Sequence, residues 1–419
     1  MTGARGPEPA TGAPAWKRNI PVLVVSQLIT VAAMSVVLPF IPFFVRELGT
    51  TDRAAVELWS GLIFSGPFLA AGLMSPVWGA LGDRYGHKPM VVRAVAGLAL
   101  VNFLLYFVQT PLQFWVLRLL QGMVTGFIPA ALAITSATTP PEKLPDSLGK
   151  LTASSAAGRL VGPAVGGLLA GFLSFRHIFL AVGATITVAL VMVAVYLREP
   201  PRATKGPAAS LGQNLRHAAA DGHTRSGLLA LFVTMAAASM VMPVFPLFVE
   251  DLLAGRGDAT VWTGLGFAVV AGFSMVGATL VGRGSERLGL KRLLVGGLGL
   301  TTAALVMHTV VSTVWALLGV RALLGLGVAG VQPVLISMIA RRAPAGAGGG
   351  VTGLATSASI FGFFAGPFTG GWLANRVGVP GVFFAAAGIT GLCALVTLVG
   401  TPRLRRDRRV IQLPDHLPR

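Results

Sequence analysis

One short segment of the chain concentrates charge between two apolar stretches. It reads GALGDRYGHKPM over 79–90 and contains Asp83, Arg84, His87 and Lys88. A carboxylate among cations can pair with a basic side chain of a neighbouring helix or stabilise a helix N-terminus. Gly79 and Gly86 suit a close helix approach and a turn, respectively. A related segment, GRGSERLGLKRLL, begins at Gly282 and places Glu286 and Arg287 203 positions after Asp83 and Arg84.

Three further cations lie inside apolar runs, where a charge is costly. Arg118, Arg159 and Arg321 each interrupt a segment that is otherwise almost uncharged. An arginine at the centre of a bilayer costs about 2.5–3.5 kcal/mol on insertion scales, so each should face protein or water. Gln121 follows Arg118 by three positions and therefore shares its helix face. Arg321 stands 203 positions after Arg118, which indicates that this position also suits the fold.

The elements that carry these residues are predicted to be membrane helices. Hydrophobic residues make up 54% of the 419-residue chain and charged residues only 11%, whereas soluble domains carry about a quarter charged residues. Apolar runs of about 20 residues are long enough to span a bilayer as helices and too long for barrel strands. The basic residues lie in short loops, which argues against a nucleic-acid partner despite the net charge of +18.

The sequence predicts an all-α polytopic protein with twelve spans. They cover roughly 20–45, 57–82, 89–109, 112–136, 147–173, 176–197, 226–249, 260–283, 291–311, 313–340, 346–374 and 379–400. The predicted organisation is a disordered cytoplasmic tail 1–19, a six-helix bundle 20–197, a linker 198–225, a second bundle 226–400 and a basic tail 401–419. Of the 33 Lys and Arg residues, 25 fall on one side and 5 on the other. The positive-inside rule therefore predicts a cytoplasmic-membrane protein with both termini in the cytoplasm.

The two predicted bundles are repeats of one another. PFIPFFVREL (39–48) matches PVFPLFVEDL (243–252), and GRLVGPAVGGLLA (158–170) matches GFFAGPFTGGWLA (362–374). Parallel repeats related by an axis along the membrane normal are typical of transporters that carry substrate between the halves. The sequence thus predicts alternating access from its internal symmetry alone.

The motifs resemble those of the major facilitator superfamily (MFS). GALGDRYGHKP is similar to its motif A, RLLQGMVTG (118–126) to motif B, and GRLVGPAVGG (158–167) to motif C of the drug:proton antiporters. The first and second spans also resemble the branch that contains the MdtG-like multidrug exporters. His87 departs from motif A, which prefers Arg at that position.

The resemblance implies roles for several of these residues. Motif A would latch the halves in the outward-facing state through Asp83 and its neighbours, or would simply be a basic inner loop. Arg118 would take part in a proton relay, or would satisfy helix carbonyls. The motif C glycines would seal a close helix contact against proton leakage, with Pro163 bending the helix; they are Gly158, Gly162, Gly166 and Gly167.

Arg159 has no counterpart in the second half, where Phe363 matches it. We expect it to face a central cavity, where it either pairs with a substrate carboxylate or phosphonate or raises the local potential, or else to snorkel or bond a neighbouring helix. The remaining cavity candidates, chosen as apolar, adaptable or polar side chains on the helices expected to surround it, are Gln27, Met34, Arg118, Gln121, Met240, Arg321, Gln332 and Phe361.

The predicted function is export of small amphipathic or anionic compounds by proton-coupled antiport. The alternative is an importer or facilitator of a sugar or another small metabolite. No acid lies at mid-span, so proton coupling would use Asp83, Glu57, Glu286 or His308. Scattered histidines and a single cysteine predict no enzyme site, no metal and no cofactor. The expected partners are the lipid bilayer, protons and a small-molecule substrate, with the protein a monomer.

Overall fold

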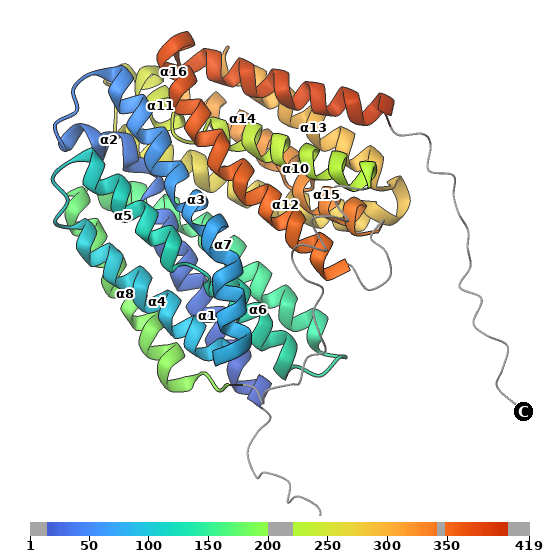
Figure 1. Ribbon diagram of the computed structural model, residues 1–419. Coiled ribbons are helices and arrows are strands. Elements are labelled where there is room, and N and C mark those ends of the chain that lie inside the picture. Colours follow the sequence, from blue (N-terminus) through green and yellow to red (C-terminus); the bar gives the residue numbers. More distant parts are fainter. Residues whose placement is uncertain (1–14, 200–220, 342–347, 401–419) are drawn as a thin grey trace, which may run out of the picture.

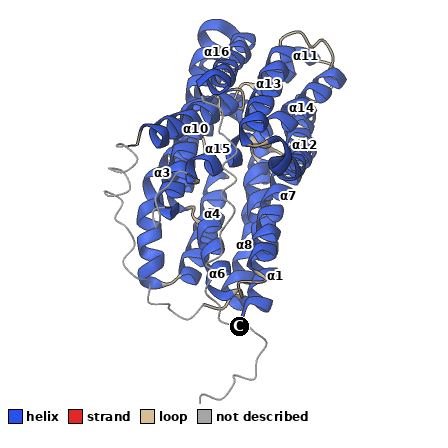
Figure 2. Cartoon of the chain, turned by 90° about the vertical axis from the view of Figure 1, so that its right-hand side faces the viewer, coloured by secondary structure: helices blue, strands red, loops and turns tan. Residues whose placement is uncertain are grey.

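The computed structural model describes residues 15–199, 221–341 and 348–400, and within these ranges Figure 2 shows only helices and loops. Most of both predicted tails and of the predicted linker lies outside the described residues. The N-terminal tail predicted over 1–19 is shorter than expected, because the first helix already begins at Ala15. Asn19 lies inside that helix and is fully buried, with its side-chain amide bonded to the backbone of Arg198.

The N-terminal half contains the elements up to Tyr196. They are α1 Ala15–Val36, η1 Leu38–Phe40, α2 Ile41–Glu47, α3 Arg53–Tyr85, α4 His87–Leu105, α5 Pro111–Val124, α6 Phe127–Thr138, α7 Leu144–Ala170 and α8 Phe175–Tyr196. A cluster of aromatic rings fills its core near the end of α2, where Phe44 lies 5.3 Å from Phe179 and 5.2 Å from Phe114 between ring centroids.

The C-terminal half repeats this order. It contains α10 Gly222–Met240, α11 Phe245–Leu253, α12 Ala259–Leu288, α13 Leu290–His308, α14 Val314–Val328, α15 Val331–Ala340 and α16 Gly348–Gly400. Helix α16 comprises two spans joined at Gly378, whose φ of 72° is not helical. Glycine allows this conformation because it has no Cβ to clash with the backbone.

The first and fourth spans of each half are broken helices. Prolines separate α1 from α2 and accompany the break between α10 and α11, because proline cannot donate the backbone hydrogen bond that a continuous helix needs. Gly126, with φ of 128°, separates α5 from α6, and the turn at 329–330 separates α14 from α15. Discontinuous helices of this kind line the binding sites of many transporters.

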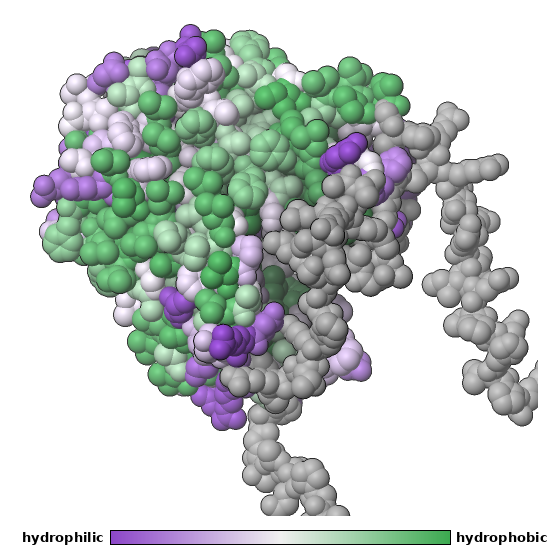
Figure 3. Space-filling view, in the orientation of Figure 1, coloured by the Kyte–Doolittle hydropathy of each residue, from purple (hydrophilic) through white to green (hydrophobic). Residues whose placement is uncertain are grey.

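Ten helices or joined helices in the described ranges are long and apolar enough to cross a membrane. Helix α7, which contains many small and polar residues as well as Arg159, is not among them, and α16 counts once although it contains two spans. With these two additions the structure contains the twelve spans that the sequence predicted. Figure 3 shows a face covered mainly by hydrophobic residues across both halves, as expected for contact with lipid.

The two halves meet mainly through two helix pairs, α3 with α16 and α7 with α12, and η1 also contacts α12. Figure 1 shows the two sets of helices converging at the end that contains α2 and α11 and diverging toward the other end. We call the first the closed end and the second the open end. A Cβ added to Gly61 of α3 would lie 2.6 Å from the Pro367 carbonyl oxygen, whereas Gly79, farther along α3, has no atom within 4 Å. Contact between the halves therefore belongs to the closed end.

Candidate functional site

Arg118 is bound inside the N-terminal half. Its side chain is buried between α5 and α3, where Nε donates to the Ile63 carbonyl oxygen at 3.3 Å and Nη1 donates to Gln121 Oε1 at 2.5 Å. Carbonyl bonding was one of the two expectations for this residue. Its position also separates Arg118 and Gln121 from the predicted cavity, because both side chains are at most 5% exposed.

Arg321 makes the equivalent backbone contact in the C-terminal half. Its Nε donates to the Gly266 carbonyl oxygen at 3.2 Å, and Gly266 stands 203 positions after Ile63, as Arg321 does after Arg118. The rest of the guanidinium lies over the Phe245 ring, 3.7 Å from its centroid, in place of the glutamine contact in the first half. A cation over an aromatic face is stabilised by the ring quadrupole. Arg321 is therefore also part of the packed interior.

Arg159 differs from these two because its side chain is exposed. Successive helix residues are separated by about 100°, so the direction of Arg159 follows from its neighbours on α7. Val161 and Leu168, 46% and 54% exposed, lie about 200° and 180° away and mark the lipid-facing side. Arg159 therefore projects away from lipid.

The face that carries Arg159 lies between two helix contacts. Gly158 and Gly162 on one side pack against α1, and Pro163 and Gly167 on the other pack against α12. Gly166 lies on nearly the same face of α7 as Arg159, two turns closer to the closed end. It is buried against α1. The same face is thus packed at Gly166 and exposed at Arg159, which lies farther from the closed end.

The other predicted cavity residues occupy mixed positions. Gln27 is buried and donates to the Leu151 carbonyl oxygen and to Ser155, so it ties α1 to α7. Met240 is 7% exposed in the C-terminal core, and Met34 packs against the N-terminal core. Gln332 and Phe361 are half-buried, and Phe361 lies beside Gly72 of α3, where the halves still touch.

The motif C glycines join α7 to two different helices. A Cβ added to Gly162 would lie 2.4 Å from the Ala32 carbonyl oxygen of α1. A Cβ added to Gly166 would lie 2.0 Å from the Val36 carbonyl oxygen of the same helix. On Gly167 it would lie 2.8 Å from the Thr260 oxygen of α12. The first contact holds one half together, whereas the second joins the two halves.

The contact between halves is duplicated by the repeat. A Cβ added to Gly264 of α12 would lie 2.4 Å from the Pro163 carbonyl oxygen. In the same way, a Cβ added to Gly61 of α3 would lie 2.6 Å from the Pro367 carbonyl oxygen. Each residue of the first pair stands 203 or 204 positions from its counterpart in the second. This glycine pattern therefore reflects packing that is common to both halves.

The motif A loop lies at the open end. Gly86 ends α3 with φ of 102°, a conformation that favours glycine, and Gly289 ends α12 in the same way with φ of 79°. The expected close helix approach at Gly79 is wrong for this conformation, since an added Cβ there would meet no atom within 4 Å. Asp83, Arg84 and Arg287 are exposed, and the Glu286 side chain lies outside the described residues.

Glu199 fixes this loop, and sequence reasoning missed it. Its carboxylate accepts hydrogen bonds from the backbone N–H groups of His87 at 2.7 Å and Lys88 at 2.5 Å. A carboxylate at a helix N-terminus satisfies unpaired donors and interacts favourably with the helix dipole. The only signal in the sequence was an acid beside Pro200 at the end of the sixth span.

Two of the four predicted proton-coupling groups are buried near the closed end. Glu57 on α3 is 4% exposed and accepts from Arg53 Nε at 3.2 Å. His308 at the end of α13 is fully buried, bonds the Ala304 carbonyl oxygen through Nδ1 at 2.7 Å and stacks on Phe383. Both side chains therefore contact residues of their own surroundings and not Arg159.

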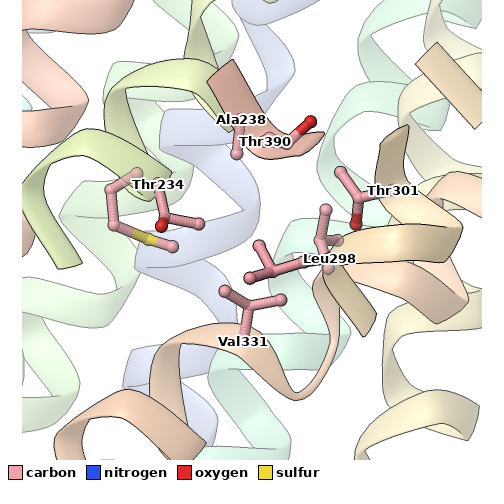
Figure 4. A pocket seen from close by; sticks show the side chains of 8 residues that line it. Thr234, Ala238, Leu298, Thr301, Val331 and Thr390 are labelled. Carbon is pink, nitrogen blue, oxygen red and sulfur yellow. The ribbon is translucent and has the colours of Figure 1, made fainter. Parts of the chain in front are cut away.

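A small cavity lies within the C-terminal half. Figure 4 shows Thr234, Thr301, Val331 and Thr390 around it. Its volume is about 10 Å³, roughly one water molecule. It therefore has no room for a substrate. Across 15–199, 221–341 and 348–400, no three His, Cys, Asp or Glu side chains are grouped so as to hold a metal ion.

The sequence model of the Major Facilitator Superfamily matches residues 23–225 and 227–413. The chain belongs to this superfamily. It is a multi-pass membrane transporter and not an enzyme. The two matched regions correspond to the two halves described above.

Curated relatives extend over nearly the whole chain. The multidrug resistance protein MdtG of Salmonella paratyphi C (strain RKS4594) is 30% identical over 95% of this chain and 98% of its own length. MdtG of Enterobacter lignolyticus (strain SCF1) is 31% identical over 91% of this chain and 92% of its own. The relationship agrees with the resemblance found in the motifs.

Solved structures share the fold at low identity. A mutant form of the nucleoside transporter NupG superimposes with a TM-score of 0.79 at 12% identity, covering 91% of this chain and 99% of that one. A bacterial homolog of the human lysosomal transporter Spinster, in an inward-facing and occupied conformation, gives 0.74 at 15% identity, with 92% and 97% covered. At these identities the likeness establishes the fold.

Proposed function

We propose that this transporter exports small amphipathic or anionic compounds by alternating access, driven by protons moving in the opposite direction. The observation that carries the proposal is that Arg159 is exposed on the face of α7 between its contacts with α1 and with α12 of the other half. Similarity to MdtG multidrug resistance proteins supports efflux as the physiological direction.

Arg159 gives the proposed site its charge preference. The other two intramembrane arginines already bond carbonyl oxygens within their own halves. Arg159 alone among the three is exposed, and Thr152 lies on the same face two turns closer to the open end and is exposed as well. A guanidinium can bind a carboxylate or phosphate-like group through two parallel hydrogen bonds. The site therefore favours an anion over a cation.

The open end supports uptake of substrate from the cytoplasm. The helices that diverge there carry the loops with most of the Lys and Arg residues, which the positive-inside rule assigns to the cytoplasm. Under this orientation, the conformation in hand is inward-facing in the cytoplasmic membrane. The cycle then requires the closed end to open outward.

Proton coupling is the part of the proposal that rests on the family resemblance. Asp83 is exposed at the open end, and Glu57 is buried at the closed end, so the two carboxylates occupy opposite sides of the membrane in this orientation. Opposite placement suits groups that respond to the pH of different compartments. The coupling is testable without knowing which carboxylate takes the proton.

Transport by purified protein in liposomes tests the proposal. With an acidic interior, antiport predicts accelerated uptake of an amphipathic anion into the vesicles, whereas symport requires the opposite gradient. We expect Arg159→Ala to reduce uptake of the anion more than uptake of an uncharged amphipathic compound of similar size, and Arg159→Lys to retain part of the preference. Lys150→Ala, which removes an exposed ion pair within α7, is the control.

Two results would overturn parts of this assignment. If the uptake rate does not change with the pH gradient, proton antiport is wrong. In that case Asp83→Asn should not change the response of uptake to the gradient either. Equal losses for anionic and uncharged compounds in Arg159→Ala contradict an anion site.

A further inference from the structure

Four charged side chains connect the halves at the closed end. Arg46 at the end of α2 donates from Nη1 to Glu250 Oε1 on α11 at 2.6 Å. Arg53, the first residue of α3, donates from Nη1 and Nη2 to the two carboxylate oxygens of Asp251 at 2.9 and 2.5 Å. Both pairs therefore cross from the N-terminal to the C-terminal half.

Arg53 has a third bond that holds it in place. Its Nε donates to Glu57 Oε1 at 3.2 Å, one turn along the same helix. The Glu57 side chain is 5% exposed, whereas that of Arg53 is 49% exposed. The buried Glu57 carboxylate therefore orients the Arg53 guanidinium through Nε, while Nη1 and Nη2 of the same guanidinium bond Asp251. Such a fork is geometrically specific, because guanidinium and carboxylate are both planar.

The first pair joins equivalent positions of the two repeats. Glu250 stands 204 positions after Arg46, in the matched segments PFIPFFVREL and PVFPLFVEDL. Equivalent positions near a two-fold axis face one another when the halves close. Two arginines or two glutamates would repel each other there, and the opposite charges instead attract. The two repeats therefore carry opposite charges at this position, and opposite charges favour closure of the two halves.

The ion pairs lie next to the backbone contacts that seal the closed end. An added Cβ on Gly371 of α16 would lie 2.5 Å from the Glu57 carbonyl oxygen, so the residue that orients Arg53 also touches the other half. The side chains of both crossing pairs are between 33% and 49% exposed. Exposed pairs contribute little individually, which suits a contact that must form and break in every cycle.

We propose that Arg46, Arg53, Glu250 and Asp251 form the gate of the closed end, with Arg53, oriented by Glu57, as its principal residue. Opening this end separates α2 and α3 from α11 and breaks both pairs. The proposal rests on alternating access by the transporter and is independent of which compounds it carries.

Spin-label distances on purified full-length protein test the gate. Cys393 is the single cysteine of the chain, so Cys393→Ser provides a background free of thiols. Labels at the exposed positions Thr51→Cys and Arg256→Cys report the separation of the halves at the closed end. A second pair, Glu142→Cys and Arg283→Cys, reports the open end. No substrate is added, so the result does not depend on the anion site.

We expect Arg53→Ala to raise the population with a separated closed end about three- to tenfold, with a matching rise in short distances at the open end. Arg46→Glu, which places two acids opposite each other, should shift the populations in the same direction. The exchanged double variant Arg46→Glu/Glu250→Arg should restore the parent distribution. Lys150→Ala, whose partner Asp146 lies on the same helix, should leave both distances unchanged.

The proposal fails if Arg53→Ala leaves both distance distributions at their parent values, or if Lys150→Ala alters them as much. It also fails if the exchanged double variant resembles Arg46→Glu, because electrostatic pairing predicts rescue. Should Arg53→Ala lose its fold, the comparison of Arg46→Glu with the exchanged variant decides alone. Unchanged distances together with normal anion transport would reject the gate and leave the proposed function standing.

Discussion

Arg118 and Arg321 hold equivalent positions in the two halves and make the same backbone bond, from Nε to the carbonyl oxygen of Ile63 in one half and of Gly266 in the other. The two bonds differ by only 0.1 Å, at 3.3 and 3.2 Å. Each arginine connects the fourth span of its half to the second. A role that both repeats retain is a role in the fold.

Loss of either arginine should therefore lower stability. Arg118→Ala leaves the Gln121 amide without its partner, and we expect a loss of about 1–3 kcal/mol in unfolding free energy. Arg321→Ala also removes the contact with Phe245 and should cost a similar amount. Thermal unfolding in detergent measures both. Arg159→Ala should stay within about 0.5 kcal/mol, since its side chain is exposed; equal destabilisation by all three would contradict the distinction.

The α1–α7 contact predicts a strong steric effect. Gly166→Ala places a methyl group 2.0 Å from the Val36 carbonyl oxygen, which is far inside van der Waals contact, so α1 and α7 must separate. We expect at least about 1–3 kcal/mol of destabilisation. Gly149→Ala on the same helix is the control, because a Cβ there meets no atom within 4 Å. Equal melting temperatures for the two variants would show that α7 packs differently.

The α7–α12 contact predicts a conformational effect instead. Gly264→Ala obstructs closure of the two halves against the Pro163 carbonyl oxygen, whereas contacts inside each half stay intact. The closed-end label pair at Thr51 and Arg256 should then report longer distances, with the melting temperature changing less than in Gly166→Ala. A large loss of stability without any change in distance would mean that this glycine supports its own half.

The motif A loop predicts a local effect of Glu199. Glu199→Gln keeps the size of the side chain but removes the charge that faces the N-terminus of α4, and the interaction should weaken by about 0.3–1 kcal/mol. Faster hydrogen exchange at the His87 and Lys88 amides measures this directly, because both donate to Glu199. Amides in the middle of α4 serve as the internal reference. Unchanged exchange at both loop amides would exclude Glu199 as the cap of α4.

Much of the fold follows from patterns in the sequence. Apolar runs long enough to cross a bilayer predicted the spans, because lipid leaves backbone polar groups no partner outside a helix. The offset of 203 or 204 positions predicted the repeat, and the structure adds bonds at the same offset, as at Ile63 and Gly266. Boundaries were less accurate at α1 and α3, which extend to Ala15 and Tyr85 because helices continue beyond their apolar parts.

The candidate site was predicted in part. Arg118, Arg159 and Arg321 look alike in sequence, since each is a lone cation in an apolar run. The sequence showed that Arg159 lacks a counterpart, whereas only the structure shows that Arg118 and Arg321 are buried and that Arg159 is exposed. The opposite charges of Arg46 and Glu250 were visible in the aligned repeats, but nothing in the alignment placed them in contact.

By itself, then, the sequence determined what each span is: its approximate length, its polarity and its counterpart in the other half. These properties depend on local composition and on the lipid environment, which act on each segment separately. The tertiary structure decided which residues meet across the halves, including Gly264 with Pro163 and Arg46 with Glu250. Such contacts depend on how two rigid bundles dock at one end, and residues about 100 or 200 positions apart in the sequence carry no local signal of it.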